Sequence, residues 1–222
     1  MNDSADLTLH LDELSRRHPE APALLAPGRR RMSFASLARH RAHTVARLRE
    51  WGIGRGDVVV WINGHRAQTA AALAIVPASA TLALLSPATP PDDLAAILER
   101  IGPKAIVLPP GREGALHVVA ARHGLAVLGA EDDGSAEAGA FELDLAMPRA
   151  SLERPRVHAP SWACINVTSG ATGSPKIVPH GHFQVLLTAA ATGERLGLSS
   201  ADIAGHVMPL HLSGGIRTVI AI

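Results

Sequence analysis

Residues 162–182 read WACINVTSGATGSPKIVPHGH, an apolar run followed by a loop of small and hydroxyl residues and then by a second apolar run. The first run, 162–167, predicts a buried strand because it is short, apolar and rich in β-branched residues. The loop from Thr168 to Lys176 combines glycines, which let successive N–H groups face one point, with hydroxyl donors and a positive charge. This combination predicts a loop that binds an oxyanion or a polyphosphate.

The loop differs from a Walker A loop in its spacing, which is G-x-x-G-x-x-K. Ile177 occupies the position of the Mg²⁺-binding Ser or Thr, and the residues after Lys176 favour a strand over a helix. Phosphates would then be bound by loop donors without a helix N-terminus. The alternative is a Gly/Ser-rich hairpin loop with no ligand.

The rest of the chain alternates between helix-like and strand-like segments. Helices are predicted at 8–18, 33–51, 66–80 with a kink at Pro77, 90–101, 113–123 and 182–196. Strands are predicted at 57–62, 81–85, 104–108, 125–128 and 203–208, with a hairpin of 23–26 and 31–33. Repeated β-α-β units predict an α/β fold of mostly parallel sheets flanked by helices. Residues 129–140 are acidic and rich in small residues, which predicts an internal loop or linker.

Composition excludes several classes of protein. The chain has 222 residues, 47% of them hydrophobic, and a formal net charge of +1, so neither wholesale disorder nor a basic nucleic-acid-binding face is expected. Its one cysteine, Cys164, allows no intrachain disulfide, which fits a reducing, cytoplasmic location. Neither a signal peptide nor a membrane span is predicted. Of the 21 basic residues, two are lysines, Lys104 and Lys176, so a lysine is less often mere surface charge here.

A second candidate site is the stretch MPLHLSGG at 208–215. A histidine and a glycine turn after a buried strand at 203–208 would line a pocket at the carboxyl end of the sheet, which makes His211 a candidate. The alternative is a strand-end turn whose histidine makes a local hydrogen bond.

Three further patterns are interpreted as structural. The glycines of GIGRG at 52–56 follow a helix and precede a strand, the reverse of the dinucleotide-binding order. His180 and His182 have no nearby ligand at zinc spacing, so no metal site is predicted. Cys164 lies within a predicted strand and is expected to be a core residue.

The stretch 165–182 resembles the phosphate-loop signature of the adenylate-forming superfamily, [ST]-S-G-[ST]-T-G-x-P-K-G, which includes acyl-CoA synthetases, peptide-synthetase adenylation domains and luciferases. The segments MSFASL at 32–37, GRGDVVVWIN at 54–63 and 73–87 resemble other landmarks of that superfamily, in the same order. Two loop positions depart from it, because Ala171 replaces a Ser or Thr and Ile177 replaces a Gly.

The resemblance implies that the loop binds the β- and γ-phosphates of ATP and that Lys176 takes part in catalysis, with His211 as a second catalytic candidate. His211 matches the family histidine once one residue is deleted. The implied cofactor-binding residues are Thr168, Ser169, Gly170, Thr172, Gly173, Ser174 and Lys176.

The same resemblance implies that residues 1–222 are a partial N-terminal domain of an acid–CoA ligase, with the C-terminal domain absent. ATP, Mg²⁺ and CoA are implied for the complete enzyme, and this chain is expected to be inactive alone. No acidic residue occurs between Val207 and Ile222, which favours a carboxylic acid without an α-amine. The alternative function is a non-catalytic nucleotide-binding or interaction fragment, or a degenerate pseudoenzyme. The apolar end, 214–222, predicts a cut within a sheet whose unpaired edge would drive self-association.

Overall fold

The computed structural model describes residues 6–62, 64, 66–109, 114–148, 162–168 and 175–221. These residues form a seven-stranded sheet in the order β7-β6-β5-β3-β4-β8-β9 and a two-stranded sheet of β1 and β2. The neighbours from β6 to β8 pair in parallel, whereas β7 and β9 pair antiparallel at the two edges. The strands are β1 (Pro22–Leu24), β2 (Met32–Ser33), β3 (Val58–Trp61), β4 (Thr81–Leu84), β5 (Ala105–Leu108), β6 (Ala126–Glu131), β7 (Glu142–Met147), β8 (Trp162–Thr168) and β9 (Lys176–Gly181).

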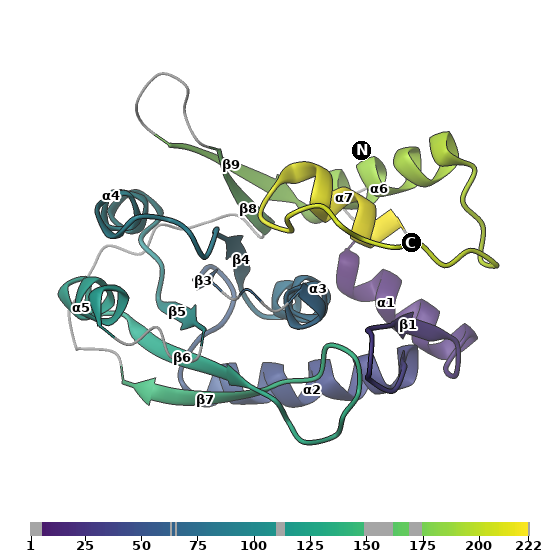
Figure 1. Cartoon of the computed structure of the whole chain (residues 1–222), viewed down its shortest axis with the longest axis horizontal. Coiled ribbons are helices and arrows are strands. Elements are labelled where there is room, and N and C mark those ends of the chain that lie inside the picture. The colour runs from purple at the N-terminus through teal and green to yellow at the C-terminus, as the bar shows by residue number, and fades with distance from the viewer. Residues whose placement is uncertain are drawn as a thin grey trace.

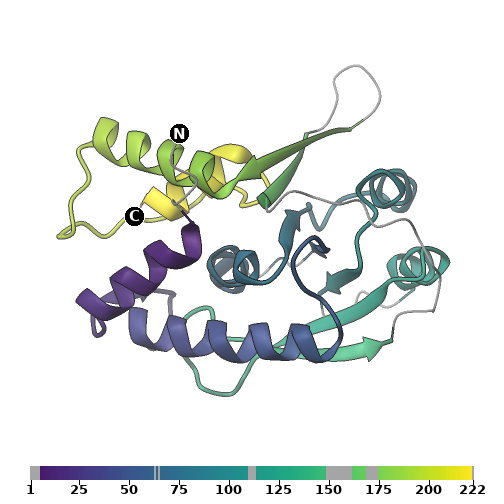
Figure 2. The ribbon, with the colours of Figure 1, turned by 180° about the vertical axis from the view of Figure 1, so that it is seen from behind.

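Helices cover both faces of the large sheet (Figures 1 and 2). One apolar cluster contains side chains of α2, α3, α6 and α7, and the other contains side chains of α4 and α5. The helices are α1 (Leu7–Arg17), α2 (Phe34–Glu50), α3 (Arg66–Ile75), the 3₁₀ turn η1 (Val76–Ala78), α4 (Pro91–Ile101), α5 (Ala115–Arg122), α6 (His182–Leu196) and α7 (Ser213–Ala221). The predicted α/β fold of mostly parallel strands between helices is confirmed.

Strand β3 shows how the sequence builds these two layers. All four of its residues are buried, and successive side chains enter opposite clusters: Val59 and Trp61 the first, Val58 and Val60 the second. This follows from the two-residue period of a strand, and a strand buried on both faces has to be apolar throughout. The Trp61 indole also donates to Thr69 Oγ1 at 3.2 Å, so its polar atom is satisfied inside the core.

Local signals placed several helix boundaries as predicted. Ser33 caps α2 by accepting a hydrogen bond from Ser36 N–H at 3.1 Å. At Pro77, where a kink within a helix of 66–80 was predicted, the α-helix instead ends: α3 stops at Ile75 and the chain changes to the 3₁₀ turn η1. Gly102 ends α4 in the left-handed conformation, with φ of 60°.

The second half of the chain differs from the prediction in two places. The loop predicted at 129–140 is present but begins after Glu131, where β6 ends, and it is followed by a strand, β7, that was not predicted. Residues 203–208 form no strand, and the side chains of Ile203 and Val207 are 76% and 82% exposed. Gly205 and His206 interrupt this apolar stretch, and it pairs with no strand in the part of the chain that the structure describes.

The C-terminal residues that were expected to form a cut sheet edge instead form helix α7. Ile216 of α7 is buried in the first apolar cluster, and Val219 and Ile220 pack against it. The self-association predicted through an unpaired strand at 219–222 therefore loses its structural basis within the described residues 219–221. No helix among the described residues is both long and apolar enough to cross a membrane.

Candidate functional site

The candidate phosphate-binding residues that the structure describes lie at the end of the β8–β9 hairpin. Thr168 is the last residue of β8, Lys176 is the first of β9, and the two are paired in register. Both side chains are exposed. The strand predicted after Lys176 is confirmed by β9. The remaining predicted residues lie outside the described part of the chain: Ser169, Gly170, Thr172, Gly173 and Ser174.

The alternation along β8 decides which face these two residues share. Cys164 packs in the first apolar cluster and Ile165 in the second. By the two-residue period, Asn166 and Thr168 lie on the face of Cys164. Lys176 is the cross-strand partner of Thr168, so its side chain lies on that face too. A hydroxyl and an ammonium group therefore stand together at the carboxyl edge of the parallel sheet, where α/β proteins bind ligands.

An arginine that the sequence analysis did not single out holds the base of the hairpin. The Arg100 guanidinium, from the last turn of α4, donates to the carbonyl oxygen of Pro175. Pro175 immediately precedes Lys176, so this contact ties the start of β9 to the helix layer on the opposite face. Nothing in the local sequence around Arg100 signals this contact, because Pro175 is 75 residues away.

His211 lies at the same edge, although the strand expected before it does not exist. The segment 207–211 has neither helix nor strand structure and is bound by two side chains from distant elements. Arg66 Nη1 donates to the carbonyl oxygens of Val207 at 2.8 Å and Met208 at 3.1 Å. Asn166 Nδ2 donates to the carbonyl oxygen of His211 at 3.0 Å. The structure thus brings the His211 segment beside the strand that ends in Thr168.

His211, the histidine of this edge, is shifted towards the neutral form. Burial lowers the pKa of His211 below its ordinary value. Towards the other end of the hairpin, opposite Cys164, burial also lowers the pKa of His180, and the nearby Arg217 adds to that effect. His182 has a pKa lowered mainly by burial, and it links the start of α6 to α1 through Asp6 at 3.2 Å. The positive charge offered to an anion at this edge therefore comes from lysine and arginine.

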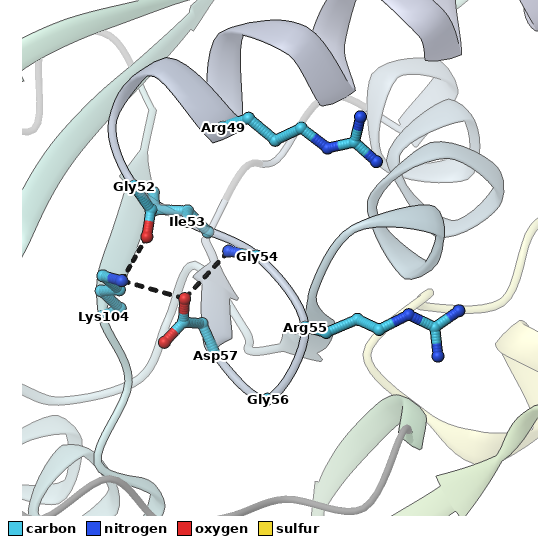
Figure 3. A pocket seen from close by; sticks show the side chains of 8 residues that line it. All are labelled: Arg49, Gly52, Ile53, Gly54, Arg55, Gly56, Asp57 and Lys104. Atoms are coloured by element: carbon cyan, nitrogen blue, oxygen red, sulfur yellow. Dashed lines mark hydrogen bonds and ion pairs between the residues drawn. The ribbon is translucent and has the colours of Figure 1, made fainter.

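A pocket of about 340 Å³ lies at the opposite, amino-terminal edge of the sheet (Figure 3). Lys104 Nζ lies 3.0 Å from Asp57 Oδ2 and also donates to the carbonyl oxygen of Gly52. Asp57 Oδ2 accepts a hydrogen bond from Gly54 N–H at 2.9 Å. The Arg49 and Arg55 side chains point away from this ion pair (Figure 3). We interpret this pocket as the structural junction between α2 and β3.

The glycines of this junction serve backbone geometry. Gly52 and Gly56 have φ values of 69° and 83°, in the left-handed region that favours glycine. They connect the end of α2 to the start of β3, so the helix-before-strand order predicted for this pattern is confirmed. Lys104 is thereby assigned a structural role, which leaves Lys176 as the lysine at the carboxyl edge.

The candidate metal and thiol chemistry of the described residues is limited. Within the described ranges, no group of three His, Cys, Asp or Glu side chains is placed to hold a metal ion. Cys164 is buried, and burial raises the pKa of its thiol to about 12, which fits the core role predicted for it.

Comparison with known proteins identifies the family of this chain. The family model described as "AMP-binding enzyme" matches residues 11–222. Tyrocidine synthase 2 of Brevibacillus parabrevis is 28% identical over 215 residues, which are 96% of this chain and 6% of that protein. A naringenin synthase of Pestalotiopsis fici is 37% identical over 86 residues, which are 38% of this chain and 3% of that protein.

Solved structures show the same fold. ATP-bound MatB from Rhodopseudomonas palustris superposes with a TM-score of 0.77 at 22% identity and covers 100% of this chain, which spans 44% of MatB. Apo MbtA from Mycobacterium smegmatis gives a TM-score of 0.76 at 23% identity over 98% of this chain and 42% of MbtA. This chain thus spans less than half of either structure. It belongs to the AMP-binding enzyme family and matches the N-terminal portion of the adenylate-forming fold that its sequence resembles.

Proposed function

We propose that this chain provides the ATP-phosphate-binding part of an enzyme that activates a carboxylic acid as its acyl-adenylate and then transfers the acyl group to a thiol, CoA. The observation that carries the proposal is the in-register pair of Thr168 and Lys176 at the carboxyl end of β8. The family match and the ATP-bound MatB neighbour support ATP as the nucleotide. A structural neighbour from Bacillus subtilis, a CoA synthetase in complex with an acyl-adenylate, supports the reaction class.

In the proposed reaction the acid's carboxylate oxygen attacks the α-phosphorus of ATP. A new P–O bond forms there, the bond to the β-phosphate oxygen breaks, and pyrophosphate leaves with the electron pair. The Lys176 ammonium and the Thr168 hydroxyl would hold the β- and γ-phosphates and stabilise the charge that accumulates on the leaving group. The loop residues between them are proposed to add backbone and hydroxyl donors: Ser169, Gly170, Thr172, Gly173 and Ser174.

The described residues place two limits on this mechanism. Among them no group of three His, Cys, Asp or Glu side chains is placed to hold a metal ion, so a Mg²⁺ ion would be held largely by the phosphate oxygens of ATP. His211 is proposed to line the site as a neutral imidazole, because burial lowers its pKa. A neutral ring can donate or accept a hydrogen bond beside the nucleotide without adding charge.

We propose an acid without an α-amine as the substrate class. The stretch 207–222 contains no Asp or Glu. Amino-acid-activating members of the superfamily have an aspartate in this region that pairs with the substrate's ammonium group. The relative named as a tyrocidine synthase makes amino acids the appropriate competitor to test. We further propose that the 222 residues bind phosphates without turnover, because they span 44% of the ATP-bound neighbour.

The test is an ATP and pyrophosphate titration of this chain by calorimetry, with Lys176→Met compared to Arg195→Met. Arg195 is an exposed cation in the last turn of α6, so its replacement controls for net charge. Losing a charged phosphate contact should weaken binding roughly tenfold or more for Lys176→Met and leave the control unchanged. Equal affinities of both variants would contradict the phosphate assignment.

A second assay addresses turnover. Pyrophosphate release is measured with aliphatic acids, aryl acids and amino acids, with and without CoA. No release by the 222-residue chain is expected. Release that Lys176→Met abolishes would show that the chain is a self-sufficient ligase, and a preference for amino acids would contradict the proposed substrate class.

A further inference from the structure

Asn166 is a polar residue at the end of the buried part of β8, residues 163–166. It is 3% exposed, and it lies between Cys164 and Thr168 on one face of the strand. A buried amide without a hydrogen-bond partner is strongly destabilising, so its partner defines its role. That partner is the carbonyl oxygen of His211, 45 residues further along the chain, at 3.0 Å.

Arg66 binds the other end of the same segment. It is the first residue of α3, on the same face of the sheet, and its Nη1 donates to two consecutive carbonyl oxygens, those of Val207 and Met208. Two hydrogen bonds from this one nitrogen hold both consecutive carbonyl groups towards the start of α3. Segment 207–211 therefore has its irregular conformation fixed at both ends by side chains.

We infer that Asn166 and Arg66 are positioning residues that hold segment 207–211, and with it His211, against the strand that ends in Thr168. The inference extends the proposed function, because it assigns how one wall of that site is built. All three acceptors are main-chain carbonyl oxygens, so these contacts can form whatever side chains the segment carries.

Hydrogen exchange and histidine titration test this inference without turnover. Asn166→Leu removes the amide while keeping the same number of side-chain heavy atoms and the same branching, and Arg66→Met removes the guanidinium while keeping an aliphatic stem. Loss of one such hydrogen bond should accelerate amide exchange in 207–212 roughly tenfold. The pKa of His211, followed by NMR, should rise towards its ordinary value as the segment loosens and the imidazole gains water.

Matched controls separate positioning from general destabilisation. Ile165→Val perturbs the same strand on the opposite face, and Arg122→Met removes an exposed cation from α5. Both controls should leave the exchange of 207–212 and the pKa of His211 unchanged. Arg66→Lys, which retains one donor group, should restore part of the slow exchange. If Asn166→Leu fails to fold, Arg66→Met decides alone, because Arg66 is exposed.

The outcome is independent of the proposed function. Unchanged exchange and an unchanged His211 pKa in the folded variants would overturn the inference even if the chain binds ATP. Failure of the wild-type chain to bind ATP would count against the proposed function, while faster exchange in the variants would still support the positioning role.

Discussion

Two adjacent glycines, Gly214 and Gly215, follow Ser213 in the first turn of α7, and their different neighbours give a sharp test of how segment 207–211 is packed. A Cβ added to Gly215 would lie 2.3 Å from the carbonyl oxygen of Pro209 and 3.0 Å from the Cα of Leu210. A Cβ added to Gly214 would lie 2.5 Å from Met208 Cε, the end of a flexible side chain that is 41% exposed. The first clash is with backbone, and the second can be relieved by rotation.

The expected magnitude follows from comparing the two alanine variants. Each gains helix propensity of up to about 1 kcal/mol over glycine, and this gain cancels in the comparison. Forcing an extra methyl group against fixed atoms typically costs about 1–3 kcal/mol. Gly215→Ala should therefore be less stable than Gly214→Ala by about 1–3 kcal/mol.

The assay is urea denaturation followed by circular dichroism, with the slope of the free energy against urea compared between the variants. The exchange of the Leu212 amide, which donates to Pro209 O at 3.1 Å, provides a local readout and should accelerate in Gly215→Ala. Equal stabilities, with equal slopes, would refute the close approach of α7 to residues 209–210.

Three other predictions concern groups away from this segment. Cys164 should resist thiol reagents at pH 8 in the native protein and react once the protein is unfolded in urea, because burial raises its pKa to about 12. Lys104→Met should lower the free energy of unfolding by about 1–3 kcal/mol in urea denaturation, since the side chains of Lys104 and Asp57 are 15% and 16% exposed and the carboxylate loses its cation. Burial lowers the pKa of His40 in the folded protein, so as the pH falls His40 takes up its proton more readily in the unfolded chain. The free energy of unfolding should therefore decrease as the pH drops through about 6.5. His40→Gln should weaken this dependence in urea denaturation curves measured at about pH 7.5 and about pH 5.5.

The sequence allowed the fold class and most elements in the first 128 residues to be predicted, because local signals agree with the tertiary structure there. Ser33 supplies a cap, Pro77 breaks a helix, and β-branched runs fill the buried strands. The sequence of the unpredicted strand β7 does alternate between apolar and acidic residues, with Leu143 between Glu142 and Asp144. This alternation was missed because it directly follows an acidic loop.

Helix α7 could not be predicted from local preference. Its glycines and its β-branched residues Ile216, Thr218 and Val219 disfavour a helix, and packing against α6 and the core overrides that preference. The residues that fix segment 207–211 were missed for a related reason. Asn166 and Arg66 contact carbonyl oxygens 45 and 141 residues away, and a main-chain acceptor leaves no mark in the sequence of the segment that it holds.

The two lysines of this chain stand at opposite edges of the sheet and differ in exposure and in contacts. The Lys104 ammonium is 15% exposed and is occupied by Asp57 and by a main-chain carbonyl, whereas Lys176 is exposed at the start of β9. Reductive methylation with an isotope-labelled reagent would therefore introduce two side-chain probes that a single spectrum resolves. The probe on Lys104 would monitor the junction of α2 and β3, and the probe on Lys176 would report the binding of an anion at the carboxyl edge. The scarcity of lysine in this chain is therefore an experimental advantage.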